Sequence, residues 1–179
     1  TITAGDPPVP QTTGFISLET PGKFAGSQLQ LGTGTGAEIA AGTTLDLQSF
    51  TLAVANSFAI TPQFAEGLAS PTIGVVSGQN LDVEPNVVLS TGDLASGSIA
   101  LSAGASSSGG NLNFGENVRL VADGIALSAG FGQTQDSQVN LATGNGATAF
   151  QRNTDSALGE YSFSLTQDAN LEDVFIPAA

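Results

Sequence analysis

Short runs of alternating apolar and polar residues recur along most of the chain, separated by Gly, Ser, Asn and Asp. The runs cover residues 15–18, 28–31, 44–47, 50–54, 80–83, 98–102, 118–120, 125–127, 138–141 and 161–165. Alternation with a period of two between turn-forming residues is typical of half-buried strands. Residues 56–68 are the least strand-like and are predicted to form one helical turn or a long loop. The pattern predicts an all-β protein.

One part of the sequence repeats. Residues 80–89 (NLDVEPNVVL) align with residues 111–120 (NLNFGENVRL), and the hexapeptide IALSAG follows each copy, at 99–104 and 125–130. Weaker echoes lie at 41–47 and 137–144. A repeat of this kind indicates units that bury their apolar faces on one another, which predicts a short β-solenoid similar to a parallel β-helix. Small residues at the end of the hexapeptide suit tight corners between coils.

An antiparallel β-sandwich or jelly roll with a strand-donating terminus is the alternative fold. Duplicated hairpins in a sandwich also produce short alternating strands with polar turns. The internal repeat favours the solenoid.

The repeat region resembles the filamentous-haemagglutinin type of bacterial exported β-helix protein. The resemblance is carried by residues 110–124 (GNLNFGENVRLVADG) and by the two IALSAG units, and it spans residues 72–145. It implies a stiff surface rod that serves adhesion or forms matrix. Proteins of that type are usually far longer, and residues 1–70 do not show their secretion-domain signature.

Three segments are predicted along the chain. Residues 1–14 form an extended, proline-containing arm, residues 15–169 form a single all-β domain with repeat copies at 80–104 and 111–130, and residues 170–179 form a C-terminal strand or arm. Both ends carry apolar residues that could add a strand to a neighbour's sheet edge, namely Ile2, Val9, Val174, Phe175 and Ile176. Head-to-tail pairing that does not close would give a homopolymer. The alternative is that each terminus covers its own fold.

Charge excludes one large class of partners. The chain of 179 residues has 3 Lys plus Arg against 16 Asp plus Glu, for a net charge of −13. So few cations cannot neutralise a run of phosphates, which argues against nucleic-acid binding and against docking on anionic membranes. No apolar run approaches the roughly 20 residues of a membrane-spanning helix, so membrane insertion is not expected.

The cellular location is predicted from residue types that the chain lacks. The chain has no Cys and no Met, the side chains most sensitive to oxidation, which suits a long-lived protein outside the cell. Its first residue is Thr1 rather than Met, so we predict an exported protein whose signal peptide has been removed. The expected location is extracellular or on the cell surface.

The sequence contains little that could catalyse a reaction. His and Cys are both absent, and the Gly-x-Ser-x-Gly elbow of serine hydrolases does not occur. A polysaccharide-acting enzyme needs two carboxylates, for which Asp82 with Glu84, or Glu116 with Asp123 around Arg119, are candidates. Such sites usually add aromatic platforms, whereas this chain has one Tyr and no Trp. We therefore do not expect an enzyme.

Calcium is the one ion that the composition suggests, because the acidic excess supplies hard oxygen donors. The candidate ligands are Asp82 and Glu84 in one cluster and Asp168 and Asp173 in another. Neither cluster matches the spacing of an EF-hand loop, and solvated strand faces and loop caps also explain these carboxylates. No other cofactor is predicted.

Together these features predict a non-enzymatic extracellular structural protein, a self-assembling subunit of a fibre, sheath or adhesive surface layer. The alternative is a monomeric extracellular domain that binds a ligand such as a carbohydrate, with glycans or a host cell surface as partners. A polysaccharide-acting β-helix enzyme is the third possibility.

Overall fold

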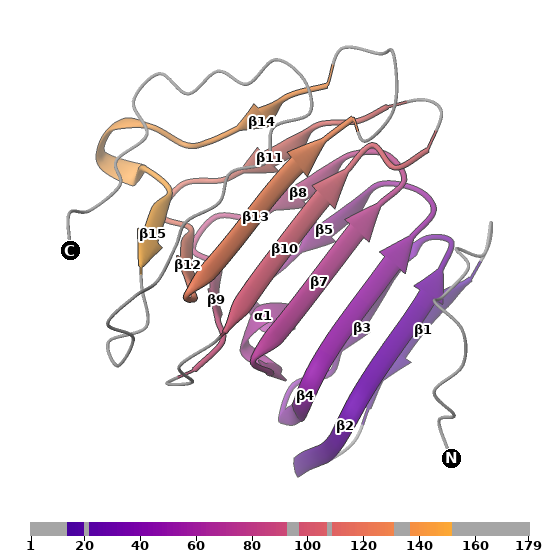
Figure 1. Cartoon of the computed structure of the whole chain (residues 1–179). Helices are drawn as coiled ribbons and strands as arrows, with labels where there is room; N and C mark the ends of the chain where they lie inside the picture. The colour runs from indigo at the N-terminus through magenta and orange to yellow at the C-terminus, as the bar shows by residue number, and fades with distance from the viewer. Residues whose placement is uncertain (1–13, 20–21, 93–96, 107–108, 131–136, 152–179) are drawn as a thin grey trace.

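The chain winds into a β-solenoid of about five turns, with parallel sheets stacked along its axis. The computed structural model describes residues 14–19, 22–92, 97–106, 109–130 and 137–151. Every pairing between the described strands is parallel. This confirms the solenoid and rejects the antiparallel sandwich. In Figure 1 the strands of the largest sheet lie side by side in chain order, from β2 to β13.

The described strands form four sheets. The largest contains β2 (Gly22–Thr33), β4 (Thr43–Val54), β7 (Thr72–Ser77), β10 (Ser98–Ala103) and β13 (Gly124–Ala129), with the short β6 (Leu68–Ala69) beside β4. A second contains β5 (Phe58–Ile60), β8 (Leu81–Val83), β11 (Leu112–Phe114) and β14 (Val139–Asn140). A third contains β9 (Val88–Ser90), β12 (Arg119–Val121) and β15 (Ala149–Gln151). The fourth pairs β1 (Phe15–Leu18) with β3 (Gly36–Ile39).

The core consists of like residues stacked from coil to coil. In the largest sheet one inward row is Leu29, Phe50, Ile73, Ile99 and Ile125, and the next is Leu31, Leu52, Val75, Leu101 and Leu127. Each of these side chains is buried, while the residues between them alternate outward. Stacking therefore gives each inward residue of the inner strands an apolar neighbour above and below, which removes apolar surface from water.

The two copies of the sequence repeat occupy successive coils of the structure. Leu81 pairs with Leu112, and Ile99 pairs with Ile125, so the two copies lie directly on one another. Gly104 and Gly130 end the two hexapeptides with φ of 69° and 67°, in the left-handed region that glycine enters without strain. The small corner residues predicted from sequence are confirmed as the points where the chain leaves the largest sheet.

One prediction about strand boundaries was wrong. Residues 44–47 and 50–54 were predicted as two strands, whereas they form the single twelve-residue strand β4. The linking residues Gln48 and Ser49 include no Gly or Pro, so nothing interrupts the extended backbone, and the long partner β2 pairs along its length. The predicted helical turn in 56–68 is confirmed as α1 (Pro62–Glu66), next to β5. A 3₁₀ turn, η1 (Gly144–Gly146), precedes β15.

The stacked core makes a clear prediction for stability. Leu101 is 1% exposed and lies between Val75 and Leu127 in its row, so Leu101→Ala should lower the free energy of unfolding by about 2–5 kcal/mol through lost burial and the cavity left behind. Urea denaturation followed by circular dichroism measures this. Ala100 is the matched control, because it is exposed on the opposite face of the same strand, and Ala100→Ser should change stability by less than about 0.5 kcal/mol. Equal effects of the two changes would contradict the inward and outward assignment.

Candidate functional site

The first surface of interest is the free edge of β2. Among the described strands, β2 pairs only with β4. The Thr33 carbonyl accepts a hydrogen bond from the Ala55 N–H, so Thr33 faces the β4 side of the strand. Because a parallel strand bonds to its two sides with alternate residues, the backbone groups of Gln30 and Gly32 face away from β4. Such a row of backbone groups is a template on which another strand can pair.

The opposite end of the described stack consists of β13, β14 and β15, the last strands of their sheets. Their inward residues, among them Leu127, Val139 and Phe150, are buried and continue the apolar rows of the coils before them. The largest sheet therefore ends in a parallel strand at each end of the described stack, β2 at one end and β13 at the other.

A polar ladder runs along the outside of the second sheet. The Asn113 side-chain amide donates to the Asp82 carboxylate at 2.7 Å, and the Asn140 amide donates to the Asn113 oxygen at 2.8 Å. These three residues occupy equivalent positions on β8, β11 and β14. The ladder ties successive coils together and fixes their register, because a shifted coil would lose each bond.

A second set of asparagines holds the corners. Asn86 and Asn117 have φ of 64° and 60°, a conformation that Asn tolerates better than other side chains with a Cβ. The Asn80 side-chain oxygen accepts from the Asn111 N–H at 2.9 Å, and the Asn111 oxygen accepts from the Gln138 N–H at 2.9 Å. The asparagines of the sequence repeat thus act in the structure as links between coils.

The predicted calcium ligands are only partly within the described residues. Asp82 is engaged by Asn113, and Glu84 directly follows β8, where its N–H bonds to the Ile60 carbonyl. Among the residues that the structure describes, no group of three or more His, Cys, Asp or Glu side chains could hold a metal ion. Asp168 and Asp173 lie outside the described residues. A calcium site stays a prediction.

The carboxylates considered for catalysis have other partners. The Arg119 guanidinium donates to the Gln151 side chain. Asp123 is 8% exposed, and one of its oxygens accepts from the Gly97 N–H at 3.3 Å while the other, Oδ1, has no hydrogen-bond partner. The hydrogen bonds of Arg119 and Asp123 therefore lead to different neighbours.

The residues predicted to join copies cannot be placed. Ile2, Val9, Val174, Phe175 and Ile176 all lie outside the described residues. Their role in assembly stays a prediction.

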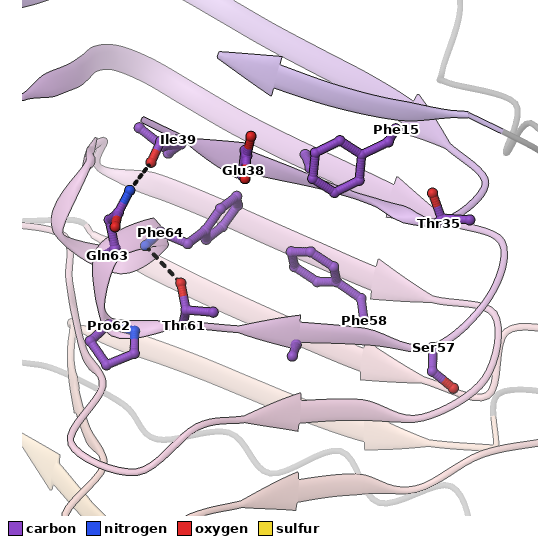
Figure 2. Close-up of a pocket in the computed structure, with 12 residues that line it drawn as sticks. Phe15, Thr35, Glu38, Ile39, Ser57, Phe58, Thr61, Pro62, Gln63 and Phe64 are labelled. Atoms are coloured by element: carbon purple, nitrogen blue, oxygen red, sulfur yellow. Dashed lines mark hydrogen bonds between the residues drawn. The ribbon is translucent and has the colours of Figure 1, made fainter. Parts of the chain in front are cut away.

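Sequence reasoning missed a groove between β3 and β5. It has a volume of about 640 Å³ and is lined by apolar side chains, with hydroxyl, amide and carboxylate groups from Thr35, Ser57, Thr61, Gln63 and Glu38 around them. Figure 2 shows Phe58 and Phe64 between the two strands and Phe15 beside them. The only sequence signal was the break in strand alternation at residues 56–68, which marks α1 but does not reveal what opens beside it.

The comparisons with known proteins give no relative: no protein-family model, curated protein or solved structure matches this chain. In the described part of the chain, no helix is both long and apolar enough to cross a membrane.

The polar ladder can be tested by adding one charge. Asn113→Asp would place a carboxylate against that of Asp82 and remove the donor between them, so we expect a loss of about 1–2 kcal/mol in the free energy of unfolding at pH 7. Urea denaturation at pH 7 measures the loss. Gln28 on β2 is exposed and offers the control, since Gln28→Glu adds the same charge away from the ladder. A loss of equal size in both variants would show that net charge, not the ladder, sets the effect.

Proposed function

We propose that this chain is a non-enzymatic extracellular structural protein, a self-assembling subunit of a fibre, sheath or adhesive surface layer. The observation that carries the proposal is the β2 edge, a twelve-residue strand that pairs on one side only among the described strands. Natural proteins usually shorten, bend or charge such edges to prevent pairing. The half from Gln28 to Thr33 carries no charged residue and is regular enough to pair fully with β4 on its other side.

Geometry supports addition of copies end to end. All described ladders run parallel to one another, so the strands of a second copy could continue them without a change of direction. Parallel strands lie about 4.8 Å apart, and each inward row would gain one more apolar neighbour at the joint. The two ends are different surfaces, so the contact is head to tail and does not close on itself. Repetition gives a filament, which makes the chain its own partner.

The outer surface supports a structural role rather than a chemical one. One outward row of the largest sheet is mostly small, with Thr51, Gly74, Ala100 and Ala126 following Gln30 at matching positions. The chain has no His or Cys to supply a general base or a thiol nucleophile. A flat face of small residues also allows filaments to lie side by side in a sheath or layer.

An extracellular location is part of the proposal. It is supported by the absence of Cys and Met and by the resemblance of residues 72–145 to exported β-helix surface proteins. The polar ladders and stacked core supply stability without disulfides, as a protein without Cys requires.

Negative-stain electron microscopy of the purified chain, with and without millimolar calcium, tests self-assembly. We expect filaments whose width matches a single coil or a small bundle of coils. Dispersed single particles at every salt and calcium concentration would overturn the proposal.

The variant Gln30→Pro tests whether β2 forms the joint. Proline removes an N–H that faces away from β4, so the ladder inside the molecule keeps its bonds while the edge loses a donor. We expect filaments to become short or to disappear, with the circular dichroism spectrum unchanged. Gln30→Thr is the matched control, because Thr suits a strand and keeps the N–H, and it should assemble normally. If Gln30→Pro assembles normally, copies join elsewhere, and deletion of residues 170–179 becomes the next variant to examine.

A further inference from the structure

The groove between β3 and β5 lies where the solenoid should have a pair of strands. In chain order β3 precedes β4, as β5 precedes β7 and β8 precedes β10, so β3 and β5 occupy the same place in successive coils. β5 pairs with β8, and β3 pairs with β1, but β3 and β5 do not pair with each other. The sheet is therefore interrupted at a seam between two strands that remain parallel.

Aromatic side chains lie in the seam between β3 and β5. Phe64 on α1 contacts Phe50 at 5.9 Å and Phe58 at 5.4 Å between ring centroids, both edge to face. The helix is anchored by Thr61, whose hydroxyl accepts the Phe64 N–H at 3.1 Å, and by Pro62 in its first turn. Figure 2 shows the two rings between the strands. They form an apolar floor between the two strands.

Both walls of the seam present backbone groups. The Phe58 N–H bonds to Asn80 and the Ile60 carbonyl accepts from Glu84, so these residues face β8 and Ala59 between them faces the groove. On the other wall, the Ala40 N–H bonds to the Leu18 carbonyl, so Ala40 faces β1, and alternation turns Ile39 and Ala37 toward the groove.

The Gln63 side chain supports this assignment of the walls. Its amide donates to the Ile39 carbonyl at 2.8 Å, in the place where a neighbouring strand would otherwise bond. Two facing rows of backbone groups above an apolar floor fit one kind of ligand, an extended polypeptide that bonds to both sides.

The charge of the groove and of the whole chain further limits the kind of ligand that could bind there. Glu38 is the one charged residue among those that line the groove, it is exposed, and its carboxylate accepts a hydrogen bond from the Ser17 hydroxyl at 2.9 Å. The net charge of −13 adds a repulsive field for any acidic ligand. The exposed ring of Phe15 offers apolar surface on the same outer side. A Lys or Arg opposite Glu38 and an apolar residue opposite Phe15 would match both features.

We propose that the groove accepts an extended segment of another protein as an added strand between β3 and β5. The segment alternates, with apolar residues turned inward to Phe58 and Phe64 and a Lys or Arg turned outward to Glu38. Its backbone pairs with Ala37 on one side and Ala59 on the other, which is strand addition at an exposed sheet edge. This side groove would let a fibre capture a basic partner chain along its length. It is separate from the end edges on which the proposed function rests.

A peptide library tests the proposal on the full chain. The probes are nine-residue peptides with Val, Ile or Leu at alternate positions and one Lys scanned through the positions between them, read by fluorescence anisotropy. We expect the best peptide to bind with a Kd of about 10–100 µM. Replacing its Lys by Glu should weaken binding at least about fivefold. Methylating alternate backbone amides should abolish it.

Variants of the chain locate the binding. Phe15→Ser should weaken the best peptide about tenfold, whereas Phe24→Ser should change its Kd by less than about twofold. Phe24 is the matched control because it is also exposed, at 39% against 54% for Phe15, and it does not line the groove. Hydrogen exchange should show peptide-dependent protection of the Ala37 and Ala59 amides.

Three results would overturn the proposal: no peptide in the library binding below about 1 mM, equal binding to both Phe variants, or no protection at Ala37 and Ala59. Binding of a neutral glycan at this groove without any peptide binding would also overturn it. Electron micrographs of the same preparations distinguish the peptide site from self-assembly. Filaments that form without any peptide binding would contradict the peptide site in the groove and would leave the self-assembly proposal intact.

Discussion

The structure depends on the parallel stacking of one coil on the next. A single coil of this chain has strands of only a few residues on two of its faces, such as Leu81–Val83 and Val88–Ser90, and could not bury its inward residues alone. Stacking gives each inward side chain a neighbour of similar size and gives each backbone row its hydrogen bonds. Every other feature follows from keeping that register: asparagine links on the outside, glycine at the corners and small residues on the flat face.

The same constraint explains why the edges matter. A closed barrel satisfies all its strands, whereas a solenoid ends in strands that have a partner on one side only. Nothing about β2 distinguishes its backbone from that of β4 except its position at the end of the described stack. In the fibre that we propose, the same parallel pairing that builds the fold would also join copies, without separate binding chemistry.

Between β3 and β5, two described strands at equivalent places in successive coils do not pair with each other. Phe64 packs edge to face on Phe58, and at that corner the chain forms α1 where the next coil forms the strand β9. Gln63 then bonds to the Ile39 carbonyl, which compensates one of the lost ladder bonds. A local departure from a regular pattern at an aromatic, partly polar groove is the kind of irregularity that functional sites produce.

The sequence by itself determined the strand-rich class, the repeat and the inward rows, because period two and small corner residues are local properties of residues such as Ile99, Leu101 and Gly104. It also predicted a helical turn or a long loop in residues 56–68, where the structure has α1. It could not determine that residues 44–54 form one strand, since that depends on a long partner lying alongside. Nor could it show the groove, because Phe15, Glu38 and Phe58 are far apart in the chain and meet only where three coils are stacked. Contacts between residues that are far apart in the sequence cannot be read from local patterns, because they depend on the register in which the coils stack.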